Sequence, residues 1–149
     1  MSNLNQCHRV FVYGSLMDGF VNHHFLTDMT NLGPRRTANS DYHFWSFSAF
    51  PAITQATENG GYVQGELYLV TNAVLRRLDM LESNGSLYER KLVHLEGEDD
   101  PAWMYFFLDG GRPVTELVSR AERVFPDENN CFCWREFWNR KRREATSIW

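Results

Sequence analysis

The sequence has little of what builds a disulfide framework, a membrane span or a nucleic-acid surface. Its three cysteines are an odd number, and Cys131 and Cys133 stand too close together for a comfortable disulfide or a usual zinc knuckle. Reduced thiols are therefore expected. No apolar run approaches membrane-spanning length, and Met1 to Arg9 lacks the apolar core of a signal peptide. The net charge of -4 argues against a nucleic-acid partner. We expect a cytoplasmic protein that binds neither membrane nor nucleic acid.

The sequence also lacks an evident set of metal ligands or a nucleophilic triad. Its five histidines are scattered, and the adjacent His23 and His24 would diverge on a helix. Cys7 and His8 would point to opposite faces of a strand. Ser15 does not stand in a Gly-x-Ser-x-Gly elbow, and no convincing His/Asp partners follow it. No metal site is expected.

What is present favours one packed domain over residues 1–149. A hydrophobic content of 43% and an aromatic content of 15% suffice for a sizeable core. Strands are expected over residues 8–13, 35–47, 62–70, 88–96 and 102–108, with a short edge strand ending near residue 53. Turns such as Glu58-Asn59-Gly60-Gly61, which is typical of a hairpin, favour a largely antiparallel arrangement. The predicted fold class is mixed α+β, with a curled, barrel-like sheet and flanking helices.

Helical spacing predicts helices over residues 21–29, 72–82, 114–125 and 132–144. Thr71 is the expected N-cap of the second. The last two form a C-terminal extension over residues 113–149. In its final helix we expect the aromatic residues to be buried against the domain or a partner chain and the arginines to face solvent, namely Phe132, Phe137 and Trp138, and Arg140, Arg142 and Arg143. The extension could mediate a homo-oligomer. The basic helix also leaves a nucleic-acid role open, which the net charge disfavours.

Val10-Phe11-Val12 reads as a strand that stops abruptly at Gly14. A glycine permits backbone angles that other residues resist, and the corner it makes can point several N–H groups into one concavity. Oxyanion and anion sites use this geometry. Read alone, the segment is more simply a tight turn leaving a core strand.

Two acids are candidates for a general base. Glu82 ends the predicted helix over residues 72–82, where the helix dipole and burial would both raise the pKa of its carboxyl group. A carboxylate tuned in this way is a plausible base. Glu66, on the tyrosine face of the strand over residues 62–70, is the runner-up. The local pattern alone favours a surface acid at Glu82.

Several short stretches together resemble the γ-glutamylcyclotransferase-like family, closest to the γ-glutamylamine cyclotransferase branch and its small bacterial relatives. Each stretch is weakly specific, but their order and spacing are more so. The resemblance covers about residues 10–108, and 113–149 lie outside it. The stretches are Phe11-Val12-Tyr13-Gly14-Ser15-Leu16, Val21-Asn22-His23-His24-Phe25-Leu26, Phe50-Pro51-Ala52-Ile53, Val63-Gln64-Gly65-Glu66-Leu67-Tyr68, Leu78-Asp79-Met80-Leu81-Glu82 and Leu87-Tyr88-Glu89-Arg90.

The resemblance implies a curled sheet around a polar cavity and an enzyme that cyclises a γ-glutamyl amine or peptide to 5-oxoproline, releasing the amine. It implies that Glu82 is the catalytic base, and that the substrate-binding residues are Tyr13, Gly14, Ser15, Leu16, Tyr88 and Tyr105. The expected partner is a small γ-glutamyl substrate, with no metal, nucleotide or redox cofactor. A non-catalytic ligand-binding or protein-interaction module on the same fold is the alternative.

Overall fold

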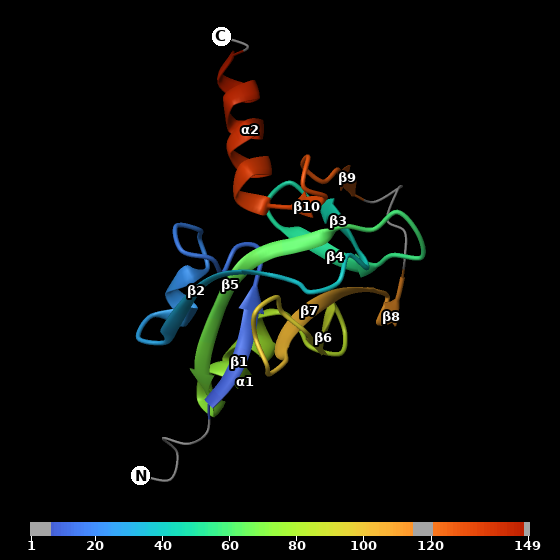
Figure 1. The fold of residues 1–149 in the computed structure, drawn as a ribbon. Coiled ribbons are helices and arrows are strands. Elements are labelled where there is room, and N and C mark those ends of the chain that lie inside the picture. The colour runs from blue at the N-terminus through green and yellow to red at the C-terminus, as the bar shows by residue number, and fades with distance from the viewer. Residues whose placement is uncertain (1–6, 115–120, 148–149) are drawn as a thin grey trace.

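The computed structural model describes residues 7–114 and 121–147, which form two sheets and two α-helices (Figure 1). In the larger sheet the strand order is β10-β5-β1-β7-β6, with β2 also paired to β5 and β8 to β7. Its strands are β1 (Cys7–Val12), β2 (Thr30–Arg36), β5 (Tyr62–Thr71), β6 (Tyr88–Val93), β7 (Ala102–Asp109), β8 (Arg112–Pro113) and β10 (Cys131–Phe132). The smaller sheet has the order β4-β3-β9, with β3 (Tyr42–Ser46), β4 (Pro51–Gln55) and β9 (Glu122–Val124).

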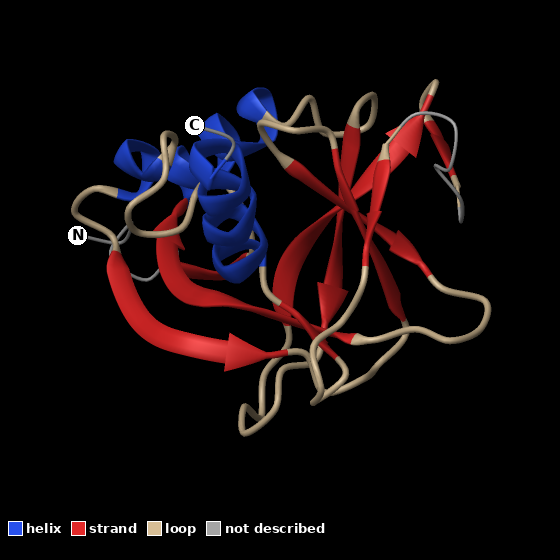
Figure 2. Cartoon of the chain, turned by 90° about the horizontal axis from the view of Figure 1, so that it is seen from above, coloured by secondary structure: helices blue, strands red, loops and turns tan. Residues whose placement is uncertain are grey.

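Most neighbouring strands run antiparallel, and β1 with β7 and β10 with β5 are the parallel pairs within the described residues. The mixed, largely antiparallel α+β class is thereby confirmed. Figure 2 shows that the longest strands curve strongly. In the part of the chain that the structure describes, the pairing leaves two open sheets rather than one closed barrel.

Strand β1 lies at the centre of the core, where Val10 and Phe11 are fully buried. Its neighbour β5 approaches closely because Gly65 has no side chain: a Cβ there would come within 2.9 Å of the Phe11 ring and would also meet the Val12 carbonyl. Phe44 of β3 contributes from the smaller sheet and stacks on Trp134, with ring planes 7° apart. The two sheets therefore share one hydrophobic core, and β1 delivers its C-terminal end to the middle of the molecule.

Helix α1 (Asn72–Leu81) forms as predicted, with the Thr71 hydroxyl accepting a hydrogen bond from the Val74 N–H. It ends in a Schellman motif, in which the Asn84 N–H donates to the Asp79 carbonyl at 2.8 Å and the Ser83 N–H to the Met80 carbonyl at 3.2 Å. Glu82 is the C-cap. Its backbone is thus fixed by hydrogen bonds on both sides of the helix end.

Ser83 occupies the left-handed position of this motif, with φ 49°, where glycine is favoured. Because the Ser83 side chain is exposed and its backbone bonds do not need it, Ser83→Gly is expected to stabilise the fold by about 0.5–1 kcal/mol. Urea unfolding measures this as a higher midpoint with an unchanged slope. A lower midpoint would show that the serine hydroxyl contributes to the cap.

Several local predictions are wrong. The helix expected over residues 21–29 shrinks to a single 3-10 turn, η2 (His23–Leu26), because the chain reverses at Asp28 with φ 71°. The residues expected to end that helix, 31–34, lie inside β2. The turn over residues 58–61 does not close a hairpin, since β4 and β5 belong to different sheets.

The helix expected over residues 114–125 is wrong at its C-terminal end, where β9 pairs with β3; residues 115–120 of that prediction lie outside the described residues. Helix α2 (Trp134–Ser147) replaces the helix expected over 132–144 and projects from the body (Figure 1). Phe132, which was expected in this helix, lies in β10 instead, while the burial of the aromatic residues and the exposure of the arginines agree with expectation. Phe132 and Phe137 are buried, Trp138 is half-buried against the core, and Arg140, Arg142 and Arg143 are exposed. No helix within the described ranges is both long and apolar enough to cross a membrane.

Candidate active site

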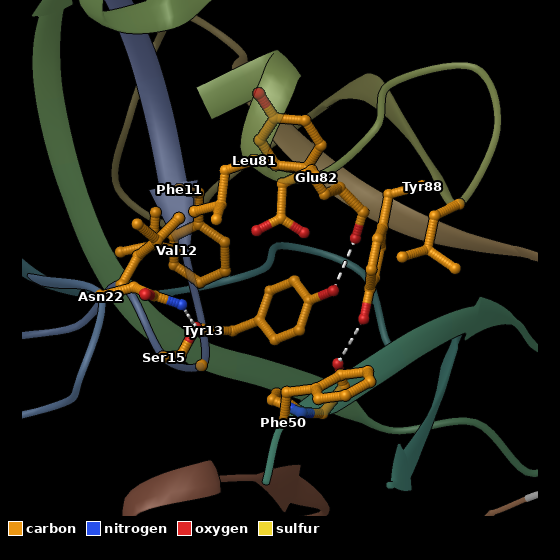
Figure 3. A pocket seen from close by; sticks show the side chains of 14 residues that line it. Phe11, Val12, Tyr13, Ser15, Asn22, Phe50, Leu81, Glu82 and Tyr88 are labelled. Atoms are coloured by element: carbon orange, nitrogen blue, oxygen red, sulfur yellow. Dashed lines mark hydrogen bonds between the residues drawn. The ribbon is translucent and has the colours of Figure 1, made fainter. Parts of the chain in front are cut away.

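A pocket of about 210 Å³ opens where β1, α1, β6, β7 and the start of β4 meet (Figure 3). It contains the expected base and every expected substrate-binding residue, although these residues are up to 92 positions apart in the chain. They are Tyr13, Gly14, Ser15, Leu16, Glu82, Tyr88 and Tyr105. The loop after β1 thus faces the end of α1 across one cavity, as expected.

Gly14 is required by a close contact rather than by its backbone angles. Its φ is not among the positive values found at other glycines, so the argument from permissive angles is wrong for this position. A Cβ on Gly14 would instead lie 2.5 Å from Cγ and 2.7 Å from Cδ of Pro51. The absence of a side chain lets the loop after β1 lie directly against the first residue of β4.

The loop after β1 is held in shape by its own hydrogen bonds. The Met17 N–H donates to the Gly14 carbonyl at 3.0 Å and the Asn22 N–H to the Ser15 carbonyl at 2.9 Å. The Asn22 side-chain amide also donates to the Ser15 hydroxyl at 2.9 Å. Among the described residues, the N–H groups of Ser15 and Leu16 donate to no protein acceptor. Both residues line the pocket, which makes these two N–H groups the candidates for binding an anionic oxygen.

Three tyrosines form a neutral wall of hydroxyl groups. Tyr13 donates to the Tyr105 carbonyl at 2.6 Å, Tyr88 to the Pro51 carbonyl at 3.0 Å, and Tyr105 to the Asp79 carboxylate at 2.7 Å. Burial, reinforced by the nearby Glu82 carboxylate, raises the pKa of all three phenols. They remain protonated at neutral pH and act as fixed dipoles, not as proton acceptors.

Glu82 carries the one carboxyl group in the pocket lining. Its side chain is half-buried and its carboxylate points into the cavity beside the Tyr13 ring (Figure 3). Within the described residues this carboxylate accepts no hydrogen bond and forms no ion pair, and no Lys, Arg or His lines the pocket. Burial without compensation raises the pKa of Glu82 to about 7. The direction agrees with the sequence prediction, and burial is the cause.

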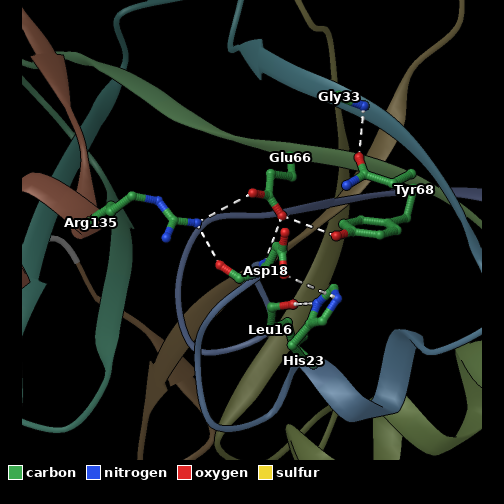
Figure 4. A network of polar contacts seen from close by, with 8 residues as sticks. Leu16, Asp18, His23, Gly33, Glu66, Tyr68 and Arg135 are labelled. Carbon is green, nitrogen blue, oxygen red and sulfur yellow. Dashed lines mark hydrogen bonds and ion pairs between the residues drawn. The ribbon is translucent and has the colours of Figure 1, made fainter.

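Glu66 does not share this pocket. Its carboxylate faces the outer side of the loop, accepting from the Asp18 N–H at 2.9 Å and from the Tyr68 hydroxyl at 3.0 Å (Figure 4). Arg135 of α2 approaches its second oxygen at 3.4 Å. Because all of these are protein partners, Glu66 supports the loop and is not free to act as a base.

Sequence reasoning did not assign seven of the lining residues to the site. Six of them supply apolar walls, namely Phe11, Val12, Phe50, Pro51, Leu81 and Leu87, and Asn22 braces Ser15. All seven stand in the short stretches that resemble the family, which was a usable signal. The local pattern of the six apolar residues does not distinguish a pocket wall from core. In the described ranges, no group of three His, Cys, Asp or Glu side chains is placed to hold a metal ion.

The chain matches a known protein family. The family model described as gamma-glutamyl cyclotransferase, AIG2-like, matches residues 10–128. The chain is 37% identical over 109 residues to the gamma-glutamylcyclotransferase family protein YtfP of Escherichia coli K12, covering 73% of this chain and 88% of that protein.

Solved structures agree on the fold. The solution structure of YtfP from Escherichia coli has a TM-score of 0.57 at 29% identity, covering 86% of this chain and 98% of that one. An AIG2-like protein from mouse has a TM-score of 0.62 at 24% identity, covering 78% and 83%. The family model spans the loop after β1, α1, β6 and β7, which together build the pocket. The chain therefore belongs to the gamma-glutamyl cyclotransferase, AIG2-like family.

Proposed function

We propose that the protein is a γ-glutamylcyclotransferase that converts a γ-glutamyl amine or γ-glutamyl peptide to 5-oxoproline and releases the free amine, with Glu82 as general base. The observation that supports this most strongly is the Glu82 carboxylate, half-buried, unpaired among the described residues and titrating near neutrality in the pocket. A group of this kind suits proton transfer at physiological pH.

The first step is binding and deprotonation. The α-ammonium group of the substrate is the cation that the Glu82 carboxylate lacks, so it would bind there and give up a proton to it. The deprotonated α-amine is then positioned to attack the γ-carbonyl carbon of the same molecule, forming a five-membered ring. Since both reacting groups belong to one substrate, much of the entropic cost is avoided once the pocket folds the chain.

The second step is collapse of the tetrahedral intermediate. Attack forms the new C–N bond and leaves a negative charge on the former carbonyl oxygen, which the N–H groups of Ser15 and Leu16 are placed to stabilise. One such donor is typically worth about a hundred- to a thousand-fold in rate. The old C–N bond then breaks as the proton held by Glu82 passes to the leaving nitrogen. Glu82, ionised again, takes the second proton from the ring nitrogen and passes it to the departing amine, which leaves as an ammonium ion. The positive charge of the substrate ammonium thus leaves with the amine, and atoms and charge balance without water.

A substrate panel tests this proposal. The purified chain is incubated with γ-glutamyl alkylamines, γ-glutamyl-lysine isopeptide, γ-glutamyl amino acids and glutathione, and 5-oxoproline and the free amine are detected by mass. We expect equimolar appearance of both products from at least one compound. Saturable binding of a γ-glutamyl compound with no 5-oxoproline from any of them would instead favour the ligand-binding alternative.

The activity should follow the ionisation of Glu82. Because only the carboxylate accepts a proton and burial raises the pKa of Glu82 to about 7, kcat/KM is expected to rise with pH through that value and to fall about tenfold per unit well below it. Initial rates between pH 5 and 8 with the best substrate measure this. A midpoint near 4.5, the ordinary value for a glutamic acid, would show that a different or solvated acid is the base.

A further inference from the structure

Arg135 of helix α2 contacts the outer side of the loop after β1 at Asp18 and Glu66, and we call this contact the anchor. Helix α2 lies beyond the residues matched by the family model. The guanidinium of Arg135 donates to the Asp18 carbonyl at 2.7 Å and lies 3.4 Å from the Glu66 carboxylate (Figure 4). Glu66 in turn accepts from the Asp18 N–H at 2.9 Å. The N–H and C=O groups of Asp18 are therefore both held from outside, by Glu66 and Arg135 respectively.

The start of helix α2, which carries Arg135, is held in place by aromatic packing. Trp134, the first residue of α2, is buried and packs against Phe44 and Phe137, so the start of the helix is tied to the smaller sheet. The next residue, Arg135, lies over the Phe20 ring at 5.0 Å from its centroid, and Trp138 meets the same ring edge-on at 6.4 Å. One face of α2 thus covers the outer side of the loop.

The held segment is adjacent to the groups that the proposed reaction needs. Asp18 follows Ser15 and Leu16 by only three and two positions, and both of these residues line the pocket and carry the N–H groups proposed for the oxyanion. Hydrogen bonds within the loop link Asp18 to this segment, because the Met17 N–H donates to the Gly14 carbonyl and the Phe20 N–H to the Met17 carbonyl. A movement of Asp18 is therefore expected to move Ser15 and Leu16 as well. A shift of about 1 Å in a positioning group can cost about a hundredfold in rate.

The anchor is too exposed to be explained by fold stability alone. The Arg135 side chain is 43% exposed and that of Glu66 is 16% exposed. Ion pairs with one partner so open to water typically contribute little to the stability of a fold. A contribution of this size is small against the stability of a domain but sufficient to bias a short loop between two positions.

We propose that Arg135 is a positioning residue of the pocket: by holding Asp18 together with Glu66, it places the Ser15 and Leu16 N–H groups for the oxyanion. The catalytic consequence rests on the proposed cyclotransferase function, whereas the loop-holding part does not. The C-terminal helix thereby contributes to a site whose lining residues all come from residues 11–105.

The test compares Arg135→Ala with Arg140→Ala in the full chain. Arg140 lies on the same helix, is exposed and pairs only weakly with Glu144 at 3.9 Å, so its removal makes the same change in charge. We expect Arg135→Ala to accelerate amide hydrogen exchange in residues 14–20 and to lower kcat/KM about ten- to a hundredfold, with the fall in kcat exceeding any rise in KM and the pH midpoint unchanged. Arg140→Ala should change none of these.

Arg135→Lys provides a second variant, in case the alanine variant folds poorly. A lysine keeps the charge but can satisfy fewer acceptors at once, so partial recovery of both exchange protection and rate is expected. Unchanged loop exchange in both Arg135 variants overturns the proposal, as does faster exchange with an undiminished rate. If no γ-glutamyl compound is turned over by the wild-type protein, the proposed function fails, and the exchange comparison still decides whether Arg135 holds the loop.

Discussion

Replacing Glu82 by glutamine is expected to reduce turnover about a hundred- to ten-thousand-fold while leaving the fold and γ-glutamyl binding largely intact. Glutamine has almost the same shape and can accept a hydrogen bond from the substrate ammonium, but it cannot take the proton. The measurement is the rate of 5-oxoproline formation at saturating substrate, alongside calorimetric affinity for the same compound.

Glu66→Gln is the matched control, since it removes an equal charge from the outer side of the loop. The glutamine amide oxygen can still accept from the Asp18 N–H, so the control should lose less activity than Glu82→Gln. If the two variants lose activity in the opposite order, the base has been misassigned.

Glu82→Gln should also make the protein more stable than the wild type at pH 8. Burial raises the pKa of Glu82 from 4.5 to about 7, so the native state binds more protons than the unfolded state between these values. The free energy of unfolding therefore falls as pH rises through this window. Glu82→Gln, which cannot ionise, should therefore have a free energy of unfolding about 1–3 kcal/mol above that of the wild type at pH 8, and the same value as the wild type below pH 4. Thermal melts at both pH values distinguish this outcome from a variant that is inactive because it is damaged.

Substitution of Gly14 by alanine is expected to disturb both the fold and the pocket. The added Cβ would come within 2.5 Å of the Pro51 ring, and the Pro51 carbonyl is the acceptor for the Tyr88 hydroxyl. Relief of this overlap must move the loop after β1 or the start of β4. Overpacking of this kind typically costs about 1–3 kcal/mol, and displacement of the loop should lower kcat/KM more than tenfold. Denaturant midpoints and initial rates measure the two effects.

The double variant Gly14→Ala with Pro51→Ala is its control. Alanine at position 51 lacks the two ring carbons that clash but keeps the carbonyl that Tyr88 needs. Part of the lost stability and rate should therefore return in the double variant, giving a positive coupling between the two sites. Additive losses, or a harmless Gly14→Ala, would show that the close approach of these segments is not what position 14 provides.

The site was predictable to the extent that its residues stand in short, ordered motifs. The Tyr13–Leu16 loop and Glu82 could be paired across the chain because their stretches occur in a familiar order. Leu87 and Phe50 stand in such stretches too, but their roles as pocket walls could not be predicted, since an apolar residue at a pocket rim and one in the core give the same local pattern. The role of Glu66 depended on Arg135, 69 positions away, and no local pattern reports a contact of that separation.

The fold shows the same division between local and distant causes. The α1 segment has a periodic apolar stripe and an N-cap at Thr71, and it formed as predicted. The spacing of Val21 and its neighbours favoured a helix, yet Val21 is 77% exposed in the structure. The error at residues 122–124 arose because Val124 pairs with Phe44 of β3, and this pairing overrides local preference.

The most direct test of the central claim is a single-turnover experiment with an isotopically labelled γ-glutamyl compound bound to excess protein. The label is followed by mass detection in wild-type protein and in Glu82→Gln at pH 8. The account predicts that wild-type protein converts the bound label to 5-oxoproline and that the variant retains it as the uncyclised compound. Formation of 5-oxoproline by the variant at the wild-type rate, or retention of the intact compound by the wild-type protein, would contradict it.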